Sequence, residues 1–191
     1  MPSVKKAISL VTGCACITLS IGYYMIHQST KSARPKRVYV DMVADLFHYG
    51  HVNFLRQAKE HGDYLIVGLS SDDDAKSYKR TPIMNLEERA KLIESCKYVD
   101  EVIVGCPLKM TQEFIEQHKI DLVLHGDDWP ISMLDEYYHV PIALGIFKTI
   151  PYTKNISTTT ILQRVHNYFS LDDHKKSHHV LLASNTNAHG A

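Results

Sequence analysis

Two histidines and a glycine form a compact motif, His48-Tyr49-Gly50-His51, which follows a short apolar run that ends near Asp41. Histidines three residues apart lie on one side of a helix, so both imidazoles can donate hydrogen bonds to one anion. A helix N-terminus adds free N–H groups, and Gly50 lets the backbone approach closely. The motif therefore indicates phosphate chemistry. Zinc is the alternative, but further ligands are needed, and the nearby candidates are Asp41 and Asp45.

A second polar segment, Ser157-Thr158-Thr159, stands at the expected start of the last helix. Its hydroxyls and the free N–H groups of the helix can bind phosphate oxygens. By itself Ser-Thr-Thr is only a helix-capping signal. Together with the histidine motif at the other end of the sheet, it indicates a phosphate site.

The positions of these residues are set by the strands and helices that carry them. After residue 37, short apolar runs alternate with segments of helical periodicity, as in stacked βαβ units. We expect strands at Val38–Val40, Tyr64–Leu69, Glu101–Val104, Asp121–Leu124 and Ile142–Phe147. We expect helices at His51–His61, Asn85–Cys96, Thr111–His118 and Ser157–Tyr168, with a capping box at Asn85 and Glu88. The fold class is therefore α/β, a Rossmann-like doubly wound parallel sheet of about five strands, which binds ligands at the carboxyl ends of its strands.

An uncharged apolar segment precedes this region, because no Asp, Glu, Lys or Arg occurs from Ala7 to His27. Its length is close to the roughly 20 residues of a membrane-spanning helix, so we expect a membrane anchor in residues 1–27. A cleaved signal peptide and a lipoprotein signal ending at Cys14 are the alternatives. Basic residues are more frequent after the segment, which predicts a single-pass membrane protein whose catalytic domain faces the cytoplasm. Residues 28–36 form a basic linker that either touches anionic lipid or is a solvated spacer.

The remaining chain divides into a catalytic domain at residues 37–169 and a polar, histidine-containing tail at 170–191, which we expect to be disordered. Lys plus Arg and Asp plus Glu both number 21, so the formal net charge is zero. A neutral chain has no overall field that attracts nucleic acid, and no nucleic-acid partner is expected.

The motifs occur in an order that resembles cytidylyltransferases, within the nucleotidylyltransferase superfamily that carries His-x-Gly-His after its first strand. The histidine motif alone also suits adenylyltransferases. The matching segments are Asp45-Leu46-Phe47-His48-Tyr49-Gly50-His51, Gly62-Asp63-Tyr64-Leu65-Ile66-Val67-Gly68, Tyr98-Val99-Asp100-Glu101-Val102, His125-Gly126-Asp127-Asp128 and Ile156-Ser157-Thr158-Thr159. The resemblance covers about Arg37 to Phe169 and is nearest to the ethanolamine-phosphate and glycerol-3-phosphate enzymes.

The resemblance implies transfer of CMP from CTP to a phospho-alcohol, most simply phosphoethanolamine, with release of pyrophosphate; glycerol 3-phosphate and phosphocholine are alternative acceptors. It implies Mg²⁺ as a cofactor with CTP, and a homodimer. It assigns His48, His51 and Lys79 to catalysis. It assigns CTP or phosphate binding to Asp45, Gly50, Arg89, Asp127, Ser157, Thr158 and Thr159, and no protein residue to a metal. Lys76 is a nearby substitute for the lysine, and Asp127 could contact ribose, cytosine or Mg²⁺ through water.

The chain departs from the family pattern at positions near the nucleotide. Met42 and Ala44 stand where relatives carry glycine and, often, an aromatic residue. Tyr152 and Asn155 stand where the arginine and glycine of Arg-Thr-x-Gly-Ile-Ser-Thr-Thr are expected, and Lys154 offers a point charge rather than a bidentate fork. A weakened nucleotide-binding protein without turnover is therefore an alternative function. An ammonium-binding role for Trp129, Met133 and Tyr137 competes with ordinary packing.

Overall fold

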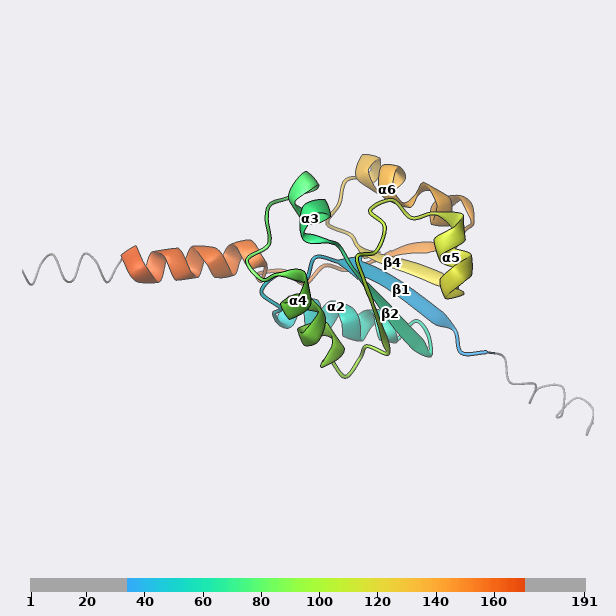
Figure 1. The fold of residues 1–191 in the computed structure, drawn as a ribbon, viewed down its shortest axis with the longest axis horizontal. Helices are drawn as coiled ribbons and strands as arrows, with labels where there is room; N and C mark the ends of the chain where they lie inside the picture. Colours follow the sequence, from blue (N-terminus) through green and yellow to red (C-terminus); the bar gives the residue numbers. More distant parts are fainter. Residues whose placement is uncertain (1–33, 171–191) are drawn as a thin grey trace, which may run out of the picture. The chain divides into compact units, whose positions relative to one another are not determined.

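The computed structural model describes residues 34–170, which form a five-stranded parallel sheet (Figure 1). The strands are β1 (Arg37–Met42), β2 (Tyr64–Leu69), β3 (Glu101–Val104), β4 (Leu122–Gly126) and β5 (Phe147–Ile150). Their order across the sheet is β3-β2-β1-β4-β5, and every neighbouring pair is parallel. The predicted Rossmann-like doubly wound α/β fold is therefore confirmed for the described residues.

Helices connect the strands and cover both faces of the sheet. They are α2 (Tyr49–Lys59), α3 (Asp72–Tyr78), α4 (Leu86–Glu94), α5 (Gln112–His118) and α6 (Ile131–Ala143), followed by a helix over residues 158–170. Helices α2 and α4 lie on one side of the sheet, and α5 and α6 lie on the other (Figure 1).

The core is built from alternate residues of the buried strands. Val38 and Val40 of β1 pack with Leu55 of α2 and Ile93 of α4 in one apolar cluster. Tyr39, between them in sequence, points to the other face and packs with Ile115 of α5 in a second cluster. Because successive strand side chains point to opposite faces, β1 is enclosed on both sides and fixes the loop that follows it.

Side chains cap the N-termini of α4 and of the last helix, near the carboxyl edge of the sheet. Asn85 accepts from the Glu88 N–H, and the Glu88 carboxylate accepts from the Asn85 N–H, so the predicted capping box is confirmed. The Ser157 hydroxyl accepts from the Thr160 N–H, which confirms the predicted cap of the last helix. These caps satisfy N–H groups that a helix start otherwise leaves without partners.

One expectation about the elements is wrong. The predicted strand Ile142–Phe147 shares only Phe147 with β5, because Ile142 belongs to α6 and Gly145 turns the chain with a φ of 69°. Helices α3 and α6 were not expected. Helix α6 contains Pro141, and the apolar residues at its end, from Ile142, had suggested a strand.

The anchor expected in residues 1–27, most of the 28–36 linker and nearly all of the 170–191 tail lie outside the described residues. Within residues 34–170, no helix has the length and hydropathy needed to cross a membrane.

Candidate active site

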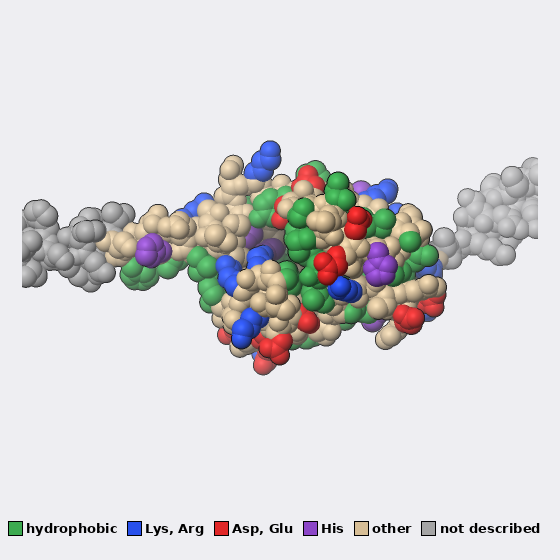
Figure 2. Space-filling view, turned by 90° about the horizontal axis from the view of Figure 1, so that it is seen from above, with side chains coloured by type: hydrophobic (Ala, Val, Ile, Leu, Met, Phe, Trp, Pro, Cys, Tyr) green, Lys and Arg blue, Asp and Glu red, His purple; other side chains and the backbone are tan. Residues whose placement is uncertain are grey.

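A cavity of about 440 Å³ lies where β1 and β4 end, at the point where the strand order reverses. Ligands of doubly wound sheets bind at this kind of position. Figure 2 shows a hollow in the middle of the described region, with basic side chains on one side and hydrophobic ones on the other. Its wall includes the basic residues His48, His51, Lys79, Arg80 and His125, the acidic residues Asp41, Asp45 and Asp128, and the aromatic residues Tyr78, Trp129, Tyr137, Tyr138 and Tyr152.

His48 and His51 lie together at the start of α2. The His48 ring accepts the Gly50 N–H at Nδ1 over 3.1 Å, and the His51 ring accepts the His48 N–H at Nδ1 over 3.3 Å. The two rings stack with centroids 3.9 Å apart. Because each Nδ1 accepts a backbone N–H, the neutral form of each ring carries its proton on Nε2. Each ring thus keeps one donor for a ligand.

Both rings are held in the neutral form. Burial is the largest cause that lowers the pKa of His51 to about 3, and electrostatic interactions with His48 and Lys79 act in the same direction. Burial is also the main cause that lowers the pKa of His48. Near neutral pH the pair therefore offers hydrogen-bond donors without positive charge.

Gly50 makes this arrangement possible because its lack of a side chain leaves room for the His48 ring. A Cβ at this position would lie 2.9 Å from Cε1 of His48 and 3.1 Å from Cγ2 of Ile156. The ring and the last loop before the C-terminal helix therefore occupy the space that any other residue would need.

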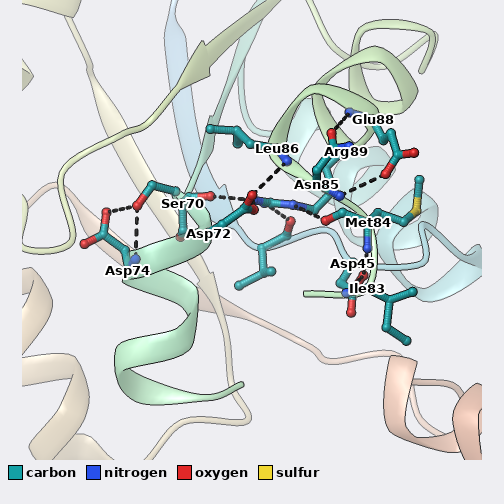
Figure 3. Close-up of polar contacts among 12 residues, drawn as sticks. Asp45, Ser70, Asp72, Asp74, Ile83, Met84, Asn85, Leu86, Glu88 and Arg89 are labelled. Carbon is teal, nitrogen blue, oxygen red and sulfur yellow. Dashed lines mark hydrogen bonds and ion pairs between the residues drawn. The ribbon is translucent and has the colours of Figure 1, made fainter. Parts of the chain in front are cut away.

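Asp45, on the cavity wall, ties three segments together. Figure 3 shows it beside Ile83 and Met84 of the loop before α4. Its Oδ1 accepts the N–H groups of Ile83 and Met84, and its Oδ2 accepts from Arg80. Its backbone carbonyl accepts the Thr158 hydroxyl at 2.8 Å. Burial alone would raise the pKa of Asp45, but the hydrogen bonds from Met84, Ile83 and Arg80 outweigh it and the pKa is lowered. The carboxylate therefore stays ionised and holds the loop before α4.

Arg89 lies under that loop instead of on the cavity wall. Its guanidinium is fully buried and donates to the carbonyls of Met84, Val43 and Ser70 and to the Asp72 carboxylate (Figure 3). With these donors used inside the protein, the arrangement does not offer Arg89 to a phosphate. The expectation that it binds phosphate is not supported by this geometry; it holds the loop to α4.

Only part of the Ser157-Thr158-Thr159 segment and of the Asp127-Asp128 pair lines the cavity. Thr158 is buried and lines the cavity, whereas Ser157 caps its helix and Thr159 is exposed, both outside the wall. Asp127 accepts the Tyr152 N–H at 2.7 Å and also lies off the wall, which includes Asp128 instead. Asp127 therefore orients the 152 loop.

A carboxylate and aromatic rings form the other side of the cavity. Asp41, at the end of β1, accepts the Tyr138 hydroxyl at 2.5 Å. Burial raises the pKa of Asp41, although His125 and Tyr138 act in the opposite direction. Trp129 packs edge-on against Tyr78 and Tyr137, with ring centroids 5.9 and 5.5 Å away. A partly buried carboxylate beside aromatic faces is suited to an ammonium group.

Comparison with known proteins assigns the site to a family. The family model described as Cytidylyltransferase-like matches residues 42–164 of this chain. The chain belongs to the cytidylyltransferase-like family. The match includes both histidines, Lys79 and Thr158, which the structure brings to one cavity.

Named relatives fall into two groups within this family. The chain is 43% identical over 135 residues to an ethanolamine-phosphate cytidylyltransferase of Arabidopsis thaliana, covering 67% of this chain and 32% of the relative. It is 42% identical over 143 residues to choline-phosphate cytidylyltransferase A of Homo sapiens, covering 72% of this chain and 38% of the relative. The chain thus spans about a third of the length of these relatives.

A solved structure shows the same fold. The lipopolysaccharide core biosynthesis protein of Thermoplasma volcanium superposes with a TM-score of 0.53 and 28% sequence identity, covering 64% of this chain and 100% of that one.

The site residues assigned from the sequence leave out several residues of the cavity. Asp41, Arg80 and His125 were not expected as site residues, although Asp41 had been considered for zinc. The available signal was position, because Asp41 and His125 lie near the ends of β1 and β4, where ligands bind. Trp129, Met133 and Tyr137 line the cavity, which favours the ligand-facing interpretation.

The departures from the family pattern have different structural consequences. Asn155 has a φ of 67°, a left-handed conformation that glycine adopts most easily and asparagine tolerates better than most residues. The turn is therefore preserved. Ala44 also has a positive φ, 57°, in the turn after β1. Tyr152 lines the cavity and donates its hydroxyl to the Ile156 carbonyl, so no guanidinium occupies that place.

Proposed function

We propose that this protein is a CTP-dependent nucleotidyltransferase that makes CDP-ethanolamine from phosphoethanolamine and releases pyrophosphate. Similarity to ethanolamine-phosphate cytidylyltransferases over 67% of the chain supports the proposal. The observation that carries it is the pair of neutral imidazoles at the start of α2, which share one cavity with Lys79 and Thr158.

The proposed reaction needs positioning and charge neutralisation rather than a covalent enzyme intermediate. A phosphate oxygen of the acceptor forms a bond to the α-phosphorus of CTP, and the bond from that phosphorus to the bridging oxygen of the β-phosphate breaks. The electron pair leaves with pyrophosphate. His48 and His51 donate through Nε2 to phosphate oxygens on which charge develops, and Lys79 supplies positive charge.

The acceptor is proposed from the aromatic side of the cavity. Asp41 and the faces of Trp129 and Tyr137 suit an ammonium group, which phosphoethanolamine and phosphocholine carry and glycerol 3-phosphate lacks. Phosphocholine is therefore the closer alternative acceptor, and choline-phosphate cytidylyltransferase A of Homo sapiens is 42% identical to this chain.

Mg²⁺ is proposed as a partner of the triphosphate. Within residues 34–170 no group of three or more His, Cys, Asp or Glu side chains could hold a metal ion, so these residues offer no preformed cage. Mg²⁺ commonly binds through substrate phosphates and one or two carboxylates, and Asp128 on the cavity wall offers such a carboxylate. When bound, the ion would neutralise phosphate charge.

The test is release of pyrophosphate by the full chain from CTP with phosphoethanolamine, phosphocholine or glycerol 3-phosphate, repeated with ATP. His51→Asn keeps an acceptor for the His48 N–H but removes the Nε2 donor, and we expect roughly a 100-fold or greater loss of turnover. His61→Ala, an exposed histidine two residues beyond α2, is the matched control and should behave as the wild type. Equal activity of His51→Asn and wild type would refute the role of the histidine pair.

A second candidate, nucleotide binding without turnover, is favoured by Tyr152 in the place of the family arginine. Calorimetry would then show CTP affinity, while no acceptor would yield pyrophosphate. Replacing Tyr152 with arginine should restore turnover in that case.

We also propose that residues 1–27 anchor the protein as a single-pass membrane protein with its catalytic domain in the cytoplasm, close to lipid products. The uncharged run from Ala7 to His27 supports this proposal. Carbonate extraction of membranes should leave the full chain in the pellet and release a form that begins at residue 28.

A homodimer remains a prediction, to be tested by light scattering.

A further inference from the structure

Two arginines, one in the loop after α3 and one within α4, use their guanidinium groups differently. Arg89 is fully buried and donates to three carbonyls and to Asp72. For Arg80, the hydrogen bond recorded within residues 34–170 runs from one terminal nitrogen to Oδ2 of Asp45, over 3.1 Å. The Nε atom of Arg80 is buried and has no partner there. A guanidinium has five N–H donors, so Arg80 retains donors for a ligand.

The loop does not depend on Arg80 for its attachment. Oδ1 of Asp45 accepts the N–H groups of Ile83 and Met84 at 3.0 and 3.1 Å, which fixes the loop through its backbone. Arg80 contacts the other oxygen only, and about a third of its side chain, 32%, is exposed. The guanidinium can therefore exchange the carboxylate for another anion while the loop stays in place.

The cavity has few permanent positive charges for a highly charged ligand. Among the described residues of its wall, only Lys79 and Arg80 are lysine or arginine. The wall also includes the carboxylates of Asp41, Asp45 and Asp128. The imidazoles of His48 and His51 have lowered pKa values and are neutral near pH 7. A triphosphate in this cavity thus depends on the two adjacent cations of one loop.

We propose that Arg80 binds the β- and γ-phosphates of CTP through a bidentate fork and so replaces the guanidinium that the family pattern places at Tyr152. The proposal rests on the proposed function, because it names the residue that recognises the triphosphate. Tyr152 bonds to Ile156 and offers no cation, whereas Arg80 reaches the same cavity from the loop after α3. Planar arginine matches two phosphate oxygens at once, which a lysine cannot do.

The experiment is calorimetric titration of the full chain with CTP and with CMP, for wild type, Arg80→Gln and Arg80→Lys. Arg80→Gln keeps an uncharged donor near Asp45, and we expect it to weaken CTP binding about 10- to 100-fold, as for loss of a charge-assisted hydrogen bond. CMP binding should change less than about threefold, because CMP lacks the β- and γ-phosphates. Arg80→Lys should lie between wild type and Arg80→Gln. Arg56→Gln is the matched control, since Arg56 also pairs with a carboxylate but lies outside the cavity wall.

The outcomes separate this proposal from the proposed function. A wild-type affinity for CTP in Arg80→Gln overturns the role of Arg80 and leaves the transferase intact. Equal losses for CTP and CMP, together with a lower melting temperature, identify Arg80 as a loop-fixing residue and also overturn it. If the wild type neither binds CTP nor releases pyrophosphate, the proposed function fails, and the role of Arg80 fails with it.

Discussion

The two imidazoles at the start of α2 are fixed by the backbone that they cap. Each Nδ1 accepts a main-chain N–H, so the tautomer and the direction of the remaining donor follow from the local fold. Burial keeps both rings neutral. Neutral donors stabilise the negative charge that develops on the phosphate in the transition state. A fixed positive charge would also bind the ground state, whereas catalysis requires stronger binding of the transition state.

Gly50→Ala tests whether the position of the rings matters. A Cβ at residue 50 would lie 2.9 Å from the His48 ring, so the ring must move by tenths of an ångström or more. We expect roughly a 10- to 100-fold loss of pyrophosphate release, because small displacements of catalytic groups reduce rates strongly. Gly145→Ala is the control. Its φ of 69° makes alanine strained by about 1 kcal/mol, but a Cβ there meets no atom within 4 Å.

Equal activities of Gly50→Ala and Gly145→Ala, at equal stability by urea unfolding, would contradict the proposed dependence on ring position.

At the scale of elements, β2 and β3 were predicted with the same bounds as observed, because each is a short segment dominated by Val, Ile and Leu. Helix α3 was missed since its sequence, DDDAKSY, has no apolar face to recognise. Helix α6 and strand β5 were confused because the apolar residues near Ile142 suit either structure. The local sequence pattern identifies elements that have one clear periodicity. It fails where the composition suits both a helix and a strand.

The same limit applies to the candidate site. His48, His51 and Thr158 were found because their motif and helix start are local signals, and the structure brings them to one cavity. For Arg89, the local pattern does not tell whether the guanidinium donates to a ligand or to carbonyls such as those of Val43 and Ser70, which lie 46 and 19 residues away in sequence. Such contacts appear only when the chain is folded.

Arg89→Lys tests the structural role of this arginine. A lysine cannot reach the carbonyls of Met84, Val43 and Ser70 at once, so buried acceptors lose their donor. We expect the free energy of unfolding to fall by about 3 kcal/mol, as for other broken buried networks. Arg56→Lys, in an exposed ion pair with Glu60, should change it by less than about 0.5 kcal/mol. Unchanged stability combined with weaker CTP binding would instead revive a phosphate-binding role for Arg89.

At the scale of the whole domain, the cavity is bounded by segments that lie far apart in the sequence. Asp45 follows the first strand, and its carbonyl accepts the Thr158 hydroxyl, 113 residues later. Its carboxylate also holds the loop that carries Arg80. Loss of this one aspartate would therefore loosen both the start of the last helix and the loop beside the cavity, so stability and ligand binding are coupled through it.

The pH dependence of stability follows from His51 as a property of the whole fold. Its pKa is about 3 in the folded protein, whereas an unfolded histidine titrates near 6.5. Between pH 6.5 and 3 the imidazole is therefore protonated in the unfolded chain but neutral in the folded protein. The contribution of His51 to the free energy of unfolding is complete above pH 6.5 and is lost as the pH falls toward 3. The limiting slope is about 1.4 kcal/mol per pH unit. Asp41 acts in the opposite sense, because its raised pKa makes the folded protein bind a proton first.

The difference between wild type and His51→Asn isolates the histidine contribution, since Asp41 is present in both. Urea unfolding at several pH values between 4 and 8 should show a steeper acid loss of stability for the wild type than for His51→Asn. Parallel curves for the two proteins would mean that the imidazole titrates as it does in the unfolded chain. His51 would then carry positive charge under mildly acidic conditions, and the neutral-donor role proposed for the pair would not hold there.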